Sequence, residues 1–138
     1  MPPKLFTVDE ANGLLPRLEP LVRHLMEKRE RLREHQTVVV KYRARAGGNG
    51  GAFLGGQFAQ AKQEIERLAA ELQEGIQEIE SWGCVVKDLE LGLVDFPARR
   101  GQEQVFLCWR LGESRIAYWH GLEEGFSGRK PLDDRSPD

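Results

Sequence analysis

The run Glu78-Ile-Glu-Ser-Trp-Gly-Cys-Val-Val-Lys-Asp-Leu89 decides the fold, because the spacing of apolar residues changes within it. Before Gly83 apolar residues recur every three or four positions, which is typical of an amphipathic helix. After Gly83 the period shortens to two, which is typical of a strand. Gly83 itself stands where helices commonly end in a glycine. The sequence therefore predicts an α+β fold, with helices first and an antiparallel sheet second.

Upstream of Gly83, a single stripe of apolar side chains predicts a helix over residues 57–82. The stripe steps by three and four throughout and consists of Phe58, Ala61, Ile65, Leu68, Leu72, Ile76, Ile79 and Trp82. Residues 47–56 precede it and contain six glycines. Because glycine inside a helix costs about 1 kcal/mol, we expect residues 47–56 to be a flexible connector.

The first helical region covers residues 7–46 and begins at Thr7-Val-Asp-Glu10, which has the form of a capping box. Proline lacks a backbone N–H and clashes with the preceding turn, so we expect Pro16 and Pro20 to interrupt this region. The result is a short helix over 8–14 and a new, long helix over 17–46. The near-heptad stripe of the long helix consists of Leu18, Val22, Leu25, Leu32, Val39 and Ala46.

The two long helices carry opposite charge. Residues 28–45 contain seven basic and two acidic side chains (net +5), whereas residues 57–82 contain six acidic and two basic ones (net −4). Opposite charges beside facing apolar stripes favour an antiparallel helical hairpin. A nucleic-acid surface is the alternative explanation of the basic stretch. The whole chain has a net charge of only −2, however, so we expect no nucleic-acid partner.

Residues 83–121 predict a small antiparallel sheet of three to four strands. The expected strands cover 84–89, 92–98, 104–111 and 115–121, with hairpin turns at 99–101 and 112–114. A three-residue second turn places Cys108, Arg110 and His120 on one face with Tyr118. A two-residue turn moves His120 to the face of Trp109. Residues 122–138 are expected to form a loop and tail that frays beyond Leu132.

Length and composition predict a single domain over residues 1–138, of which 40% are hydrophobic and 30% charged. No apolar run approaches the roughly 20 residues that cross a bilayer, and no secretory signal is visible. We therefore expect a cytoplasmic protein without a membrane partner. The two cysteines, Cys84 and Cys108, are too few for a disulfide scaffold or a four-ligand zinc site. The glycine-rich stretch lacks the Gly-Lys-Ser/Thr ending of a phosphate-binding loop, and we expect no cofactor.

Polar residues that could carry chemistry gather in the predicted sheet and the loop after it; they are Asp95, Arg110, Glu113, His120, Glu123 and Arg129. Asp95 stands in an apolar strand, so its burial requires a partner. One interpretation is a structural ion pair between Asp95 and Arg110 or Arg129.

The other interpretation of these residues is a site. His120 would be a general base oriented by Asp95 or Glu113, or His120, Asp95 and Glu113 or Glu123 would be mixed nitrogen and oxygen ligands of a divalent metal. The candidate contacts of a small anionic ligand are Arg110, Arg129 and Trp119. A tryptophan packs more often in a core or an interface than against a ligand.

Several segments together resemble an uncharacterised bacterial family known only as a domain of unknown function. They are Thr7–Pro16, Val86–Asp88, Gly92-Leu-Val-Asp-Phe-Pro97, Leu107-Cys-Trp-Arg-Leu-Gly-Glu113, Ile116-Ala-Tyr-Trp-His120 and Gly125-Phe-Ser-Gly-Arg129. The resemblance runs from about residue 5 to residue 132. It implies a bacterial or archaeal cytosolic protein of this size, and it brings no activity, cofactor or catalytic residue.

Two functions follow as hypotheses. The first is a small interaction or ligand-binding module that self-associates, because the apolar stripes exceed what one facing helix covers. Pairing two hairpins would give a four-helix bundle, and we expect a homodimer. The alternative is a small hydrolase-like or metal-dependent enzyme that uses the polar cluster on the sheet.

Overall fold

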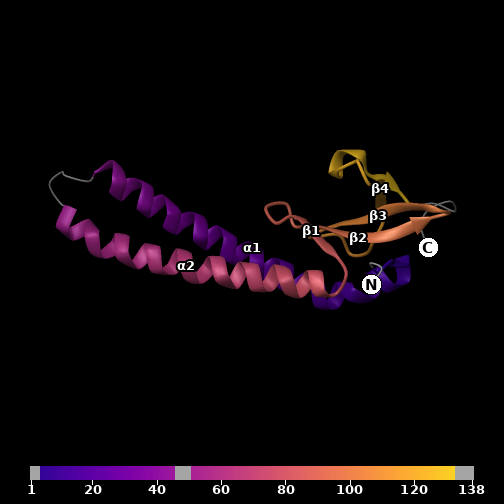
Figure 1. The fold of residues 1–138 in the computed structure, drawn as a ribbon, viewed down its shortest axis with the longest axis horizontal. Helices are drawn as coiled ribbons and strands as arrows, with labels where there is room; N and C mark the ends of the chain where they lie inside the picture. The colour runs from indigo at the N-terminus through magenta and orange to yellow at the C-terminus, as the bar shows by residue number, and fades with distance from the viewer. Residues whose placement is uncertain (1–3, 46–50, 133–138) are drawn as a thin grey trace.

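The computed structural model describes residues 4–45 and 51–132, which form two long helices followed by a five-stranded sheet (Figure 1). The elements are α1 (Val8–Ala44), α2 (Gly51–Ser81), β1 (Val85–Asp88), β2 (Leu93–Arg100), β3 (Glu103–Arg110), β4 (Tyr118–Gly121), the 3-10 helix η1 (Phe126–Gly128) and β5 (Lys130–Pro131). The α+β class and the helical hairpin are confirmed, but the sheet has five strands rather than three to four. Within the described ranges, neither helix has an apolar stretch long enough to cross a bilayer.

The start of α1 is the predicted capping box. The Thr7 hydroxyl accepts a hydrogen bond from the Glu10 N–H, and the Glu10 carboxylate accepts one from the Thr7 N–H, both at 3.0 Å. The two bonds satisfy backbone donors that a helix start leaves unpaired. The helix ends at Ala44, and the expected last residue, Ala46, lies outside the described residues.

α1 is one continuous helix, so the predicted interruption between residues 14 and 17 is wrong. Pro16 and Pro20 lie inside it, with exposed side chains. The opposite face of the same turns is buried at Leu15, Leu18 and Val22. Burying each such side chain stabilises by about 1.5–3 kcal/mol, which offsets the roughly 3 kcal/mol that an internal proline costs. Packing under the sheet therefore overrides the local preference.

α2 begins at Gly51, so the second half of the predicted connector 47–56 is helical. The remaining part of the connector lies outside the described residues. Tyr42 and Phe58 stack with ring centroids 4.2 Å apart and join the start of α2 to the end of α1. Such tertiary packing stabilises the helical conformation of residues 51–56, which their glycines disfavour. At its other end, Gly83 adopts φ +101° and follows the helix as predicted.

The sheet is an antiparallel meander in the order β1-β2-β3-β4-β5. β2 and β3 pair as far as Arg100 and Glu103, so their turn is Gly101-Gln102 rather than 99–101. β3 and β4 are joined by residues 111–117, which is longer than either predicted hairpin turn. The fifth strand, β5, lies in the segment expected to be a loop and tail.

The main core lies between one face of the sheet and the first half of α1. The sheet contributes Val94, Phe96, Ala98, Val105, Leu107, Trp109 and Trp119, none more than 9% exposed. The N-terminal region contributes Phe6, Ala11, Leu15, Leu18, Val22 and Leu25. Phe6 links the two layers, because its N–H donates to the Pro97 carbonyl at 2.7 Å and its ring packs edge-on against Phe96.

Beyond the sheet the two helices continue side by side as an arm (Figure 1). We define the arm as residues 28–44 of α1 and 51–71 of α2; Val39, Ala61 and Leu68 are buried within it. Where the arm meets the rest of the molecule, Leu25 of α1 packs directly against Gly75 of α2. A Cβ on Gly75 would lie 3.0 Å from Leu25 Cδ1 and 3.1 Å from its Cγ, so the helices approach too closely there for a side chain.

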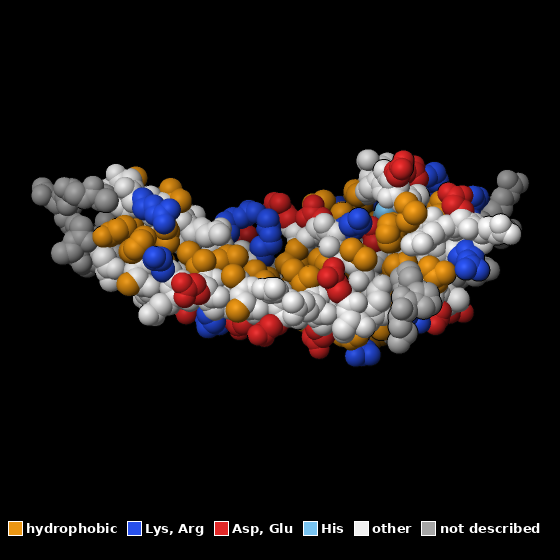
Figure 2. All heavy atoms as spheres, in the orientation of Figure 1, with side chains coloured by type: hydrophobic (Ala, Val, Ile, Leu, Met, Phe, Trp, Pro, Cys, Tyr) orange, Lys and Arg blue, Asp and Glu red, His pale blue; other side chains and the backbone are white. Residues whose placement is uncertain are grey.

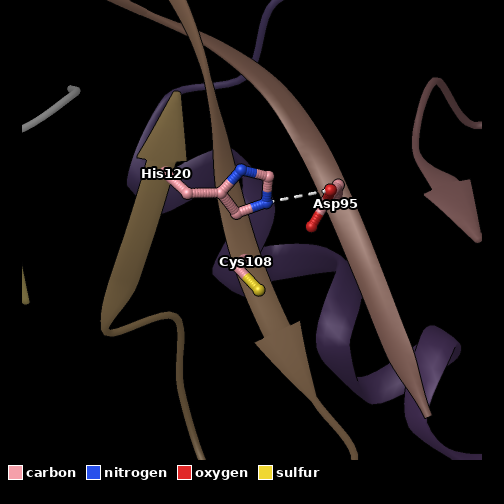
Figure 3. Close-up of side chains that lie close together, drawn as sticks. All are labelled: Asp95, Cys108 and His120. Atoms are coloured by element: carbon pink, nitrogen blue, oxygen red, sulfur yellow. Dashed lines mark hydrogen bonds and ion pairs between the residues drawn. The ribbon is translucent and has the colours of Figure 1, made fainter. Parts of the chain in front are cut away.

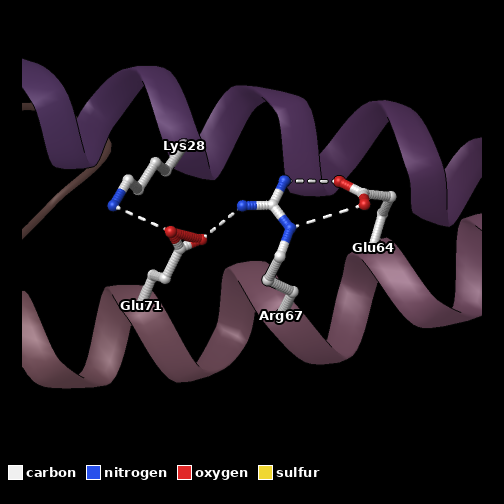
Figure 4. A network of polar contacts seen from close by, with 4 residues as sticks. All are labelled: Lys28, Glu64, Arg67 and Glu71. Carbon is white, nitrogen blue, oxygen red and sulfur yellow. Dashed lines mark hydrogen bonds and ion pairs between the residues drawn. The ribbon is translucent and has the colours of Figure 1, made fainter.

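Charge pairing between the two helices is sparser than the sequence predicted. Within the described residues, a single ion pair joins α1 to α2, between Lys28 Nζ and Glu71 Oε1 at 3.5 Å. Glu71 also binds Arg67 of its own helix, and Arg67 binds Glu64 (Figure 4). The antiparallel hairpin is as predicted, but direct ion pairs between its helices contribute little to it.

Two further basic side chains of α1 reach the loop between β1 and β2 instead of α2. Arg29 and Arg33 each lie 3.6 Å from a carboxylate oxygen of Glu90, which follows β1. These exposed pairs stabilise by at most about 1 kcal/mol each. They tie the base of the arm to the β1–β2 loop.

Candidate functional site

Three polar side chains meet on the face of the sheet opposite the α1 core: Asp95 of β2, Cys108 of β3 and His120 of β4 (Figure 3). The strand register brings them together. Asp95 pairs directly with Cys108, and His120 pairs with Phe106, which lies two residues from Cys108 on the same face. The three-residue alternative for the second turn had predicted this shared face of Cys108 and His120, although the connection itself is longer.

All three side chains are buried. Asp95 is 1% exposed, Cys108 1% and His120 2%. The carboxylate oxygen, the sulfur and the imidazole nitrogen that could act as ligands lie within 4.8 Å of one another. Within the part of the chain that the structure describes, this is the one such group of histidine, cysteine and acidic residues.

The hydrogen bonds of His120 determine where its protons lie. Nδ1 is 2.8 Å from the Gly121 carbonyl oxygen, which can only accept, so Nδ1 carries a proton and donates it. Nε2 lies 3.0 Å from Asp95 Oδ2. An unprotonated Nε2 and an ionised carboxylate would place two lone pairs against each other. One hydrogen atom therefore lies between Nε2 and Oδ2, and either the imidazole or the carboxyl group of Asp95 donates it.

Burial shapes the acid–base properties of the other two groups. It raises the pKa of Asp95, against the opposing influence of His120, Lys87 and a hydrogen bond with Cys108. Burial, together with the nearby Asp95 carboxylate, raises the pKa of the Cys108 thiol to about 12. Cys108 is therefore a neutral thiol near neutral pH, which is not the reactive form of a catalytic cysteine.

A second polar group lies beside the cluster and is built around Arg129. Its Nη2 donates to both Glu113 carboxylate oxygens, at 2.7 and 2.8 Å, and lies 3.3 Å from the Cys108 carbonyl oxygen. The guanidinium also stacks over Tyr118, 4.0 Å from the ring centroid, and over Phe126 at 4.7 Å. Arg129 Nε is buried without a hydrogen-bond partner among the described residues.

The structural ion pair predicted for Asp95 is replaced by a different one. Asp95 binds His120 and not Arg110 or Arg129, because its side chain points to β4. Glu113 binds Arg129 and not His120, so it does not orient the imidazole. The structure thus brings Asp95 and His120 together, as the site hypothesis required, and separates Glu113 from them.

The remaining candidates lie apart from the cluster. Glu123 is exposed and belongs to no potential ligand group among the described residues. Trp119 is 9% exposed and packs in the main core, with Arg100 and Lys130 against its ring. Arg110 is exposed, with its guanidinium 5.6 Å from the centre of the Phe126 ring.

Sequence reasoning did not name Cys108 among the candidate site residues, although it considered a register that placed Cys108 on the face of His120. The signal that could have found it was strand alternation, which had already placed Cys108 beside His120 in one register. Chemically, the cluster can hold a proton or a cation between its three donor atoms. It is closed to a dissolved substrate in this conformation, because none of its side chains is more than 2% exposed.

Comparisons with known proteins agree with the predicted resemblance to an uncharacterised family. No curated protein and no solved structure matches the chain at a significant level. One family profile, described as an uncharacterized conserved protein (DUF2203), matches residues 4–132 and so covers both helices and all five strands. The chain belongs to this DUF2203 family.

Proposed function

We propose that the protein is an assembly module whose arm binds the arm of a second copy, so that two hairpins form a four-helix bundle. The observation that carries this proposal is apolar surface along the arm, where the sheet no longer covers the helices. Val40 is 65% exposed on one side of the buried Val39, Val38 and Tyr42 are partly buried on its other side, and Phe58 and Ile65 of α2 are also only partly buried. Figure 2 shows apolar atoms in a run along the arm between blue and red side chains.

The charges of the hairpin favour a second copy as the occupant of this surface. Several basic side chains of α1 and of the residue that follows it have no ion pair among the described residues; they are Arg31, Lys41, Arg43 and Arg45. The same holds, within the described ranges, for Glu66 of the arm and for three acidic side chains of α2 that lie between the arm and the sheet, which are Glu74, Glu78 and Glu80. When two arms pack antiparallel, the basic helix of each copy can face the acidic helix of the other.

The experiment is sedimentation equilibrium at micromolar concentration, at low and high salt. We expect a dimer that weakens as salt rises, because screening reduces the attraction between exposed charges. Val40→Glu should shift the equilibrium to monomer, because it places a carboxylate in the apolar contact. Leu122→Glu is the matched control: Leu122 is similarly exposed, at 52%, but lies outside the arm, so this variant should remain dimeric.

Three outcomes would contradict the proposal. One is a monomer across the concentration range, and a second is a dimer that both variants weaken equally. The third is a monomer that binds duplex DNA tightly and with steep salt dependence, which would assign the basic face of α1 to nucleic acid instead.

A further inference from the structure

Asp95, Cys108 and His120 offer one oxygen, one sulfur and one nitrogen donor to a single point. A tetrahedral zinc ion binds these atom types at about 2.0–2.3 Å, which places neighbouring ligand atoms about 3.3–3.6 Å apart. Here Nε2 and Oδ2 are 3.0 Å apart, and all three ligand atoms lie within 4.8 Å of one another. Small side-chain movements would therefore bring all three to one ion.

The imidazole is already oriented as metal-binding histidines are. A ligating histidine commonly donates its second ring N–H to a carbonyl or carboxylate, which directs the other nitrogen to the metal. His120 does this through Nδ1 and the Gly121 carbonyl oxygen, so Nε2 faces Asp95. Nε2 and Oδ2 therefore both face the point where an ion bound by the cluster would lie.

We propose that Asp95, Cys108 and His120 are the protein ligands of a zinc ion. A mixed set of thiolate, imidazole and carboxylate suits zinc better than calcium or magnesium, which prefer oxygen alone. The charges balance, because one thiolate and one carboxylate neutralise one divalent ion in a buried place. Three protein ligands leave a fourth position for water. The nearby positive charge of Arg129 is neutralised by Glu113, at 2.7 and 2.8 Å.

The three ligands project from one face of the sheet and are at most 2% exposed, so we expect a bound ion to exchange slowly with solvent.

The test begins with elemental analysis of untagged protein purified without chelator, where we expect up to one zinc per chain. The metal is then removed and replaced with Co²⁺, whose visible bands report tetrahedral coordination and whose near-ultraviolet band reports a bond to thiolate. This proposal does not depend on the assembly of the arm.

Three variants separate a built site from adventitious binding. Asp95→Asn retains a hydrogen-bond donor to Nε2 but loses the negative charge, so it should fold, by circular dichroism, and bind zinc more than tenfold more weakly. Cys108→Ser should lose the thiolate–cobalt band. Cys84→Ser is the control, since Cys84 is also buried but lies in no ligand group of the described residues, and this variant should keep both properties.

The proposal is overturned if the metal-free protein binds neither Zn²⁺ nor Co²⁺ at one ion per chain. It is equally overturned if Asp95→Asn and Cys108→Ser bind as the wild type does, or if Cys84→Ser abolishes the thiolate–cobalt band.

Discussion

Gly75→Ala should make the protein less stable than the higher helix propensity of alanine alone would predict, because Gly75 lies where α2 touches Leu25 of α1. An added Cβ would overlap Leu25 Cδ2 and would lie 3.0 Å from Cδ1 and 3.1 Å from Cγ. Leu25 cannot easily turn away, since its side chain is 1% exposed in the core. The close approach of the helices, rather than backbone conformation, therefore requires glycine at this position.

The magnitude follows from two opposing contributions. Alanine inside a helix is favoured over glycine by about 1 kcal/mol, and an extra carbon in a packed core costs about 1–3 kcal/mol. Gly13→Ala isolates the first contribution, because Gly13 also lies in a helix and nothing would meet its added Cβ within 4 Å. Gly13→Ala should therefore stabilise by about 0.4–1 kcal/mol, and Gly75→Ala should be less stable than Gly13→Ala by about 1–3 kcal/mol.

Urea unfolding followed by circular dichroism, at one fixed protein concentration, measures these free energies. Leu25→Ala alone should cost about 2–5 kcal/mol through the cavity that it leaves. In the double variant Leu25→Ala/Gly75→Ala the new methyl group fills part of that cavity, so the double variant should lose less stability than the sum of the two single variants. The packing described for Gly75 is wrong if Gly75→Ala is as stabilising as Gly13→Ala, or if the effects of Gly75→Ala and Leu25→Ala are additive.

Three further perturbations test other parts of the structure. Glu10→Ala should lower the free energy of unfolding above pH 4.5 and have a smaller effect below it, as urea unfolding of both proteins across pH 3–7 would measure. The reason is that the hydrogen bond from the Thr7 backbone lowers the pKa of folded Glu10 from 4.5, and this stabilisation is lost as pH falls through the folded pKa. Asp95→Ala should cost about 3–5 kcal/mol in the presence of chelator, because His120 Nε2 then lies buried without its partner, and a cost below 1 kcal/mol in thermal melts would contradict the buried pair. Trp109→Ala should also cost about 3–5 kcal/mol, since Trp109 is fully buried, and unfolding free energies that match the wild type would refute its place in the core.

The fold was predictable where periodicity and end signals agreed. The stripe before Gly83, the capping box at Thr7 and the strand patterns each describe a local preference that the tertiary structure also satisfies. Pro16 and Pro20 show the limit of local rules, because the decisive interaction is burial under a sheet that begins far along the chain. β5 contains only Lys130 and Pro131, which is too short for any period to reveal.

The candidate site was predictable only in part, because its geometry depends on register. The position of Asp95 in an apolar strand predicted that its carboxylate is buried and has a partner, and His120 was among the candidate partners. The choice between His120 and an arginine rests on how β2, β3 and β4 align, and the seven residues 111–117 between β3 and β4 leave that alignment open to sequence reasoning. Asp95 joins Cys108 and His120 on their shared face because the register of β2 and β3 pairs Asp95 with Cys108.

α1 runs unbroken from beneath the sheet to the end of the arm, so a rotation of the helix at the sheet would move the tip of the arm. With 37 residues, α1 is about 55 Å long at 1.5 Å per residue. Its first half is clamped against Phe6 and the sheet, while the segment beyond Lys28 extends about 24 Å further. A 10° tilt at the clamp would displace the tip at Ala44 by about 4 Å. Small changes in how strands pack on Leu18 and Val22 would therefore be enlarged at the tip, far from the sheet.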